Sequence, residues 1–304
     1  MTINRRTFIT GASLAAGLAA CSPSQQPAER QAITVGLTYI PNVQFCPFYL
    51  GVQERLFDNL DVTLRHHGEQ EGLFEAVKLG REDIVFASAD EAVVAGDLEV
   101  VATAYQRYPA EIMIAGGASS LEDLRGKSLG IPGRFGSSYY AALAALDTAG
   151  LTEQDVKLVE IGFTSVAALS TGKVDAIVGF RNNELVQFEQ QGIEVASLPI
   201  APKPVLVGPS LITTKERAKE PWVQAIVNGM LEAERRIVDD PKAAIDATAK
   251  EVPALQEAAQ RASAERVLAA TAELWKGDTD APHVDVDQDA MQRMEEFLQK
   301  AGIK

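Results

Sequence analysis

Two segments of this chain repeat one pattern, and that repeat limits the folds open to it. AVKLGREDIVF (76–86) aligns with ALSTGKVDAIV (168–178), about 92 residues further on. Each copy is a helical stretch, then Gly-x-x-Asp, then an apolar run. The glycine is expected to end the helix and the aspartate to open a tight turn into a strand. Because each copy follows a strand–helix–strand order, we predict two duplicated α/β units with parallel-type sheets and flanking helices.

Short β-branched runs alternate with helical patterns on both sides of the repeat. Strands are predicted at 32–40, 60–67, 83–88, 127–133, 156–162 and 175–180, with a returning strand in 205–214. Helices are predicted at 47–57, 72–80, 137–150 and 166–172. From 215 to 300 the apolar residues recur at helical spacing almost throughout. A length of 304 residues fits two compact units.

The first twenty residues are interpreted as an export signal. Arg5 and Arg6 precede small and apolar residues up to Ala20, a stretch too short to span a bilayer. LAAC (18–21) resembles a bacterial lipobox, in which the signal is cut before a cysteine that is then lipidated. RRTFI (5–9) resembles a twin-arginine signal, so the export route stays open. We predict an export signal at 1–20 and lipidation of Cys21.

The polar, proline-containing segment 21–31 is predicted to be a lipidated tether, since several acyl chains together anchor a protein stably. The mature protein would then lie on the outer face of the bacterial cell membrane or in the periplasm. Cys46 would be its one free cysteine, which excludes an internal disulfide, and we expect it to be a small buried residue. A net charge of −14 argues against a nucleic-acid partner.

The stretch YIPNVQFCPFY (39–49) carries four aromatic residues in a chain that is only 6% aromatic. Pro41 and Asn42 break the helical pattern, so Tyr39 and Phe45 are predicted to lie in a loop. Rigid rings at a strand end are well placed to stack on a flat ligand. Phe48 follows in the helix, where core packing competes with ligand contact.

Three further loops follow strands in the predicted units. In open parallel sheets, ligands bind beyond the carboxyl ends of the strands. If the two units face one another, all four loops line one cleft. The loops are YIPNVQF (39–45), SADE (88–91), PGRFGSS (132–138) and FRNNE (180–184).

The polar residues of these loops suit the edge of a heterocycle that has both N–H and C=O groups. Ser137 or Ser138 could cap the following helix, cradle an anion at its start, or do both. Asn182, Asn183 and Glu184 offer amide donors, amide acceptors and a carboxylate, although a capped helix start would use the same residues. Asp90 and Glu91 carry a similar ambiguity, and Ser88 of the same loop is a further candidate for ligand contact.

Catalytic and metal-binding motifs are missing from the sequence. It contains no Gly-x-Ser-x-Gly, no His-Glu-x-x-His and no P-loop. The histidines are His66, His67 and His283, and neighbours in a strand point to opposite faces. We therefore expect neither an enzyme nor a metal site nor a bound cofactor.

Several motifs together resemble the solute-binding proteins of bacterial ABC importers. They are the lipobox, TYIPNVQFCPFY (38–49), SLEDLRGKSLGIPG (120–133), IGFT (161–164) and GFRNNE (179–184). The chain is most similar to the group that binds riboflavin or thiamine-pyrimidine precursors, which is related to sulfonate-binding proteins. Fungal relatives with this fold are enzymes with a Cys-rich iron-binding run, which is absent here.

The resemblance implies a two-lobed periplasmic-binding-protein fold of type II, α/β in class, with a ligand cleft between lobes that close by hinge motion. Lobe 1 would hold 32–107 plus 212–304, and lobe 2 would hold 108–211. The first crossover would bring Tyr105 beside the cleft. The implied partners are an ABC permease and its ATPase, and we expect a monomer.

The ligand implied first is riboflavin, which is neutral, planar and edged with donors and acceptors. Tyr39, Phe45, Phe135 or Phe163 would stack on it, and the amide and carboxylate groups at 182–184 would read its edge. A thiamine pyrimidine precursor (hydroxymethyl- or formylamino-pyrimidine) and an organosulfonate remain the alternatives. A sulfonate would want cationic donors, and those considered beside the proposed cleft are few, Arg107 and Arg134 among them.

Overall fold

The alternating strands and helices form two sheets in the computed structural model, which describes residues 30–38, 40–67, 72–203 and 205–304. Within these residues the strands make two five-stranded sheets, and Gln31–Lys304 form one compact unit. The predicted α/β class is confirmed. The predictions for the signal at 1–20, for Cys21 and for most of the tether lie outside the described residues, as does Tyr39.

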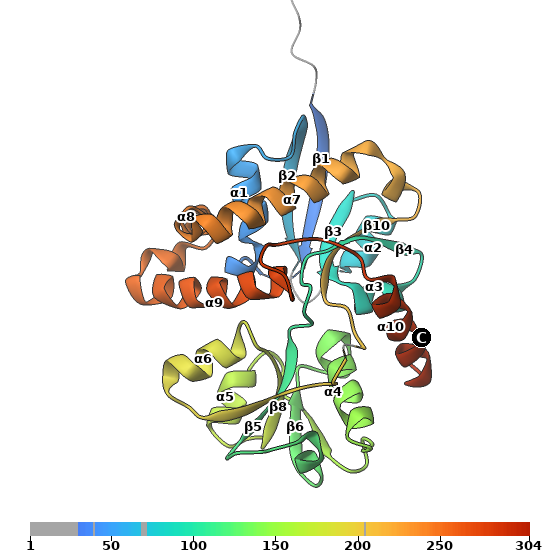
Figure 1. Ribbon diagram of the computed structural model, residues 1–304, viewed down its shortest axis with the longest axis vertical. Coiled ribbons are helices and arrows are strands. Elements are labelled where there is room, and N and C mark those ends of the chain that lie inside the picture. Colours follow the sequence, from blue (N-terminus) through green and yellow to red (C-terminus); the bar gives the residue numbers. More distant parts are fainter. Residues whose placement is uncertain (1–29, 39, 68–71, 204) are drawn as a thin grey trace, which may run out of the picture. The chain divides into compact units, whose positions relative to one another are not determined.

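The first sheet has the strand order β2-β1-β3-β10-β4 (Figure 1). Its strands are β1 (Gln31–Thr38), β2 (Leu60–His67), β3 (Ile84–Ser88), β4 (Leu98–Thr103) and β10 (Pro209–Thr214). β1 runs parallel to both β2 and β3, as the sequence predicted. β10 returns from late in the chain and inserts antiparallel between β3 and β4, so the sheet is mixed.

The second sheet has the order β7-β6-β8-β5-β9 and is mixed in a similar way. Its strands are β5 (Ala110–Ala115), β6 (Ser128–Ile131), β7 (Lys157–Glu160), β8 (Ala176–Phe180) and β9 (Val195–Pro199). β6 is parallel to β7 and β8, whereas β5 is antiparallel to β8 and β9. In both sheets, three adjacent parallel strands therefore carry the strand ends where the candidate loops lie.

Helices cover each sheet (Figure 1), and apolar residues of the helices and strands together form the hydrophobic core. Those near the first sheet are α1 (Cys46–Glu54), α2 (Leu73–Lys78), α3 (Ala89–Ala95), α7 (Pro221–Asp239), α8 (Pro241–Glu251) and α9 (Ala258–Lys276). Those near the second sheet are α4 (Gly136–Thr148), α5 (Ser165–Ser170) and α6 (Glu184–Gln191). α1, α7 and α8 pack on one another. Among the described residues, no helix is both long enough and apolar enough to cross a membrane.

The last helix, α10 (Gln288–Lys300), shares an apolar cluster with the second sheet. Met294 Sδ accepts a hydrogen bond from the backbone N–H of Val207. Lys300 Nζ lies 2.6 Å from a carboxylate oxygen of Asp147 on α4. The end of the chain therefore packs next to residues of the predicted lobe 2, and the lobe boundaries given above stay a prediction.

The glycines of the sequence repeat end their helices as predicted. Gly80 follows α2 with a φ of 73°, and Gly172 follows α5 with a φ of 69°. This left-handed region of backbone space is open to glycine at no steric cost. The two copies of the repeat therefore share their helix ends.

The aspartates of the repeat have a second role that the sequence did not reveal. Asp83 Oδ2 accepts a hydrogen bond from the backbone N–H of Thr34 on β1 at 2.8 Å. Asp175 Oδ2 accepts the equivalent bond from Ser128 on β6, also at 2.8 Å. Each carboxylate thus ties the strand it precedes to the neighbouring parallel strand, in addition to opening a turn.

Candidate functional site

The aromatic segment after β1 contributes mainly to the core of the first sheet. Phe45 lies in a 3₁₀ turn (Val43–Phe45) rather than in an open loop, and Phe48 on α1 is fully buried. Their rings make edge contacts with Phe86, with centroids 6.2 and 5.1 Å apart respectively. Asn42 begins the turn, because its Oδ1 accepts from the N–H of Gln44 at 2.8 Å. A ligand contact by Asn42, Phe45 or Phe48 stays a prediction.

Two other predicted rings are exposed instead. Phe135 precedes α4 and is 62% exposed, and Phe163 follows β7 and is 50% exposed. Large apolar side chains of this exposure are uncommon in the described residues, and these two lie in loops that follow strands of the second sheet. Both therefore offer ring surface that a ligand could cover.

The start of α4 is held by acidic residues in the first turn of α3. Glu91 Oε1 accepts from the backbone N–H of Ser137 at 2.9 Å, and Asp90 Oδ1 accepts from the Ser137 hydroxyl at 2.7 Å. The predicted capping by Ser137 or Ser138 is wrong: α4 begins at Gly136, with no capping bond from the preceding residue, Phe135. The carboxylate of Glu91, 46 residues earlier, supplies the acceptor instead. The positive end of a helix dipole favours this arrangement.

The carboxyl pair at this helix start is poorly solvated. Asp90 is fully buried, and the Tyr108 hydroxyl donates to its Oδ2 at 2.8 Å. Burial, and then the Glu91 carboxyl, raise the pKa of Asp90 to about 7, while hydrogen bonds from Ser137 and Tyr108 lower it in part. Burial also raises the pKa of Glu91. Ser88 precedes this pair in a half-buried position opposite Pro209.

Asn182 has different hydrogen-bond partners from Asn183 and Glu184. It is fully buried, and its Nδ2 donates to the Thr271 hydroxyl on α9 at 2.9 Å. Glu184 Oε2 instead accepts from the N–H of Phe180 at 2.8 Å, and Asn183 Nδ2 donates to Glu184 Oε1 at 3.2 Å. Burial raises the pKa of Glu184. Asn182 therefore faces the interior, while Asn183 and Glu184 organise the start of α6.

Tyr105 joins Asn182 in a buried polar group. It lies between β4 and β5 and is 3% exposed, with its ring 6.5 Å from that of Phe86. Burial raises the pKa of the Tyr105 hydroxyl above its usual range, and the nearby polar side chains of Thr271 and Asn182 oppose that effect. The predicted site residues Tyr105 and Asn182 are thus brought together, with the rings of Phe45 and Phe48 linked to them through Phe86.

Two buried polar residues escaped the sequence reasoning. Thr271 and Glu234 are polar residues at core-facing positions of α9 and α7, and both are buried. Their signal was a polar residue on the apolar stripe of an amphipathic helix. Cys46, by contrast, is the buried free cysteine that was predicted. No group of three or more His, Cys, Asp or Glu side chains in the described part of the chain is placed to hold a metal ion.

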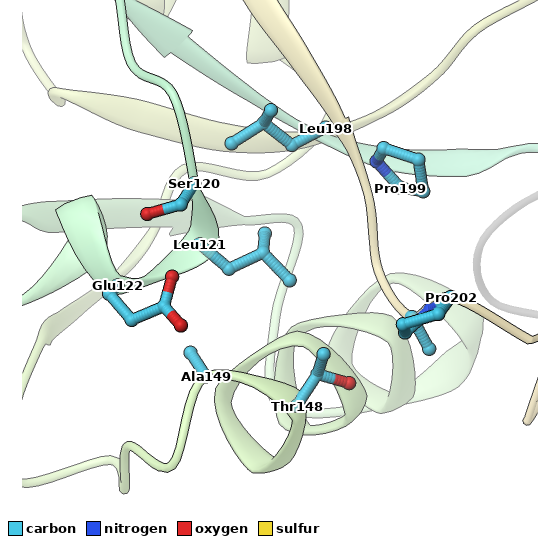
Figure 2. A pocket seen from close by; sticks show the side chains of 9 residues that line it. Ser120, Leu121, Glu122, Thr148, Ala149, Leu198, Pro199 and Pro202 are labelled. Carbon is cyan, nitrogen blue, oxygen red and sulfur yellow. The ribbon is translucent and has the colours of Figure 1, made fainter.

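A hollow of about 250 Å³ lies beside the second sheet. Figure 2 shows the side chains that line it. The hollow lies between the start of the 3₁₀ turn Leu121–Leu124, the end of α4 and the end of β9. None of the predicted site residues lines it. The lining residues are Ser120, Leu121, Glu122, Thr148, Ala149, Leu198, Pro199, Ala201 and Pro202.

Comparisons with known proteins agree with this architecture. The family model described as NMT1/THI5 like matches residues 42–244. A riboflavin-binding protein, RibY of Chloroflexus aurantiacus, is 31% identical over 307 residues, covering 95% of this chain and 86% of the relative.

Solved structures show the same fold at low sequence identity. The periplasmic aliphatic sulphonate binding protein SsuA of Escherichia coli superposes with a TM-score of 0.68 at 17% identity, covering 89% of this chain and 88% of that one. The ligand-binding component of an ABC-type import system of Staphylococcus aureus gives 0.63 at 14% identity, covering 90% and 93%. The predicted type II periplasmic-binding-protein fold is confirmed. The chain belongs to the NMT1/THI5-like family.

Proposed function

We propose that this protein binds riboflavin or a closely related flavin and delivers it to the permease of an ABC importer. The observation that carries the proposal is the 31% identity to a riboflavin-binding protein across nearly the whole of both chains. The membrane partners would be the permease and ATPase subunits of that importer. The relative that is 31% identical is itself a binding protein, which supports the solute-binding role.

The polar groups near the strand ends suit an uncharged heterocycle. Tyr105, Asn182 and Thr271 are neutral hydrogen-bonding residues set among aromatic rings. A planar ring edged with N–H and C=O groups can satisfy such side chains, and a mostly apolar site with a few polar groups is typical for ligands of this size. We propose that Tyr39, Phe135 and Phe163 cover the faces of the ring.

The cationic residues of the candidate loops are already paired, which speaks against an organosulfonate. Arg107 Nη2 lies 2.6 Å from a carboxylate oxygen of Asp278. Arg134 forms ion pairs with Glu153 and Glu160, and Arg181 Nη1 lies 3.4 Å from Oε1 of Glu111. An anionic head group would have to displace these carboxylates before it gained a cationic partner.

We expect riboflavin at tens of micromolar to raise the melting temperature of the protein without residues 1–21 and to lose its fluorescence on binding. Ligand at about 100 times its Kd stabilises a protein by about 2.7 kcal/mol, which a thermal-shift assay detects. Titration calorimetry would give the affinity. Hydroxymethyl-aminopyrimidine and an alkanesulfonate serve as the comparison ligands. A shift with either of these, and none with riboflavin, would replace the flavin by that ligand.

We further propose that a lipid on Cys21 anchors the protein to the membrane, with residues 21–31 as the tether. The full chain is expected to partition into the detergent phase of a Triton X-114 extract, because acyl chains add about 0.8 kcal/mol for each buried CH₂. Cys21→Ser should move the protein to the aqueous phase, and Cys46→Ser is the matched control. Detergent partitioning of the Cys21→Ser variant would contradict the anchor.

A further inference from the structure

The orientation of the Asn182 side chain is decided by Thr271. The Thr271 hydroxyl donates its single hydrogen to the backbone carbonyl of Val267, one turn earlier on α9, at 2.7 Å. The same oxygen can therefore only accept a hydrogen bond from Asn182, which it does from Nδ2 at 2.9 Å. The amide nitrogen is fixed toward Thr271, and the amide oxygen is turned away from it.

That arrangement leaves a buried acceptor without a donor. Asn182 is fully buried, and its Oδ1 has no hydrogen-bond partner among the described residues. Buried amide oxygens are nearly always hydrogen-bonded, so an unpaired one calls for a specific explanation. Asn182 follows β8, at the strand end where ligands of such sheets bind.

We propose that Asn182 Oδ1 accepts a hydrogen bond from a ring N–H of the ligand, and that Thr271 is the residue that positions the amide for this contact. The inference rests on the proposed function and refines it: the site selects heterocycles with an imide or lactam N–H. A ligand that lacks this donor leaves the amide oxygen buried and unpaired. The site therefore binds such a ligand more weakly, because an unpaired buried polar group costs free energy.

The contacts around α9 show why Thr271 can do this. α6 and α9 pack together, and a second polar link joins them where the Ser263 hydroxyl donates to Gln190 Oε1 at 2.9 Å. Asn182 lies just before α6, so α9 holds this region at two points. The link through Ser263 does not touch Asn182 and supplies a matched control.

The test compares riboflavin with its analogue methylated at the imide nitrogen, using titration calorimetry on the protein without residues 1–21. The wild type should prefer riboflavin by about 10- to 100-fold. Thr271→Val keeps the branched shape but removes the acceptor, so it should weaken riboflavin and leave the methylated analogue unchanged, bringing the ratio close to one. Thr271→Ser should restore the preference, and Asn182→Ala should abolish it.

Ser263→Ala is expected to retain the full preference, even if it lowers the melting temperature. The ratio of the two ligands' affinities distinguishes positioning of the Asn182 amide from an effect on fold stability. A variant that only destabilises the fold lowers both affinities by the same factor. Equal binding of the two ligands by the wild type would overturn this inference and leave the flavin proposal standing. An unchanged ratio in Thr271→Val would also overturn it. If neither ligand binds the wild type, both proposals are wrong.

Discussion

Replacing Gly229 by alanine is expected to lower the free energy of unfolding by about 3 kcal/mol, the upper end of the usual cost of overpacking a core. The ring of Phe57 is buried between α1 and α7, at Gly51 and Gly229. A Cβ at 229 would lie 2.3 Å from Cδ1 of Phe57 and 2.8 Å from the carbonyl oxygen of Leu56. The ring cannot retreat toward α1, because a Cβ at Gly51 would already be 2.6 Å from it.

Thermal and urea unfolding would measure this effect. Asn228→Ala, at the exposed neighbouring position of α7, is the matched control and should change stability by less than about 0.5 kcal/mol. In a Phe57→Ala background, Gly229→Ala should cost much less, since the ring is gone and only the Leu56 carbonyl remains close. The same cost in both backgrounds would show that Phe57 is not what excludes a side chain at 229.

Glu234→Gln is expected to stabilise the protein at neutral pH and to flatten the pH dependence of its stability. The Glu234 carboxyl is 1% exposed on the apolar face of α7, and its Oε2 has no hydrogen-bond partner within the described residues. Burial raises the pKa of Glu234 well above its usual value, and the charge of Arg235 only partly opposes this. The folded protein therefore holds a proton that the unfolded chain releases.

The sign follows from proton linkage. A raised folded pKa means that the folded state binds more protons, so stability falls as the pH rises above the unfolded pKa of about 4.3, by about 1.4 kcal/mol per pH unit. Glutamine carries no titrating proton at this position and would recover the stability that Glu234 loses over this range. Unfolding curves at pH 5, 6, 7 and 8 would show the two proteins converging at the acidic end.

Asp90 also has a raised pKa, so a smaller slope should persist in Glu234→Gln up to about pH 7. Glu232→Gln, at a half-exposed position of the same helix, is the control and should leave the slope unchanged. Parallel stability curves for wild type and Glu234→Gln would mean that the Glu234 carboxyl is charged in the folded protein.

Local chemistry made much of the fold predictable. The strand at 60–67 was predicted to the residue, and the strand predicted at 83–88 begins one residue later, at Ile84, because both runs are bounded by turn residues. The Gly-x-x-Asp repeat predicted two matching helix ends, and the structure has them. The start of α4 was predicted wrongly because its acceptor is Glu91, which no sequence window around 137 contains.

The candidate site was predicted less completely for a related reason. The aromatic run 39–49 predicts an apolar surface, but it does not reveal whether that surface is buried. Phe45 and Phe48 pack against Phe86 in the core, whereas Phe135 of another loop is exposed. Asn182 was found because it follows a strand. Thr271 comes 89 residues later on a helix, and only the fold brings the two together.

The position of β10 sets the order in which the architecture can be completed during synthesis. All strands of the second sheet lie between residues 110 and 199, whereas the first sheet needs residues 209–214 between β3 and β4. A ribosome-bound chain can therefore complete the second sheet before the first. Until β10 is made, the edge of β3 is unpaired and β4 lacks its hydrogen-bonding neighbour. Bare edges invite pairing with other chains, so the earliest-made half of this protein is the one that most needs shielding by chaperones before release.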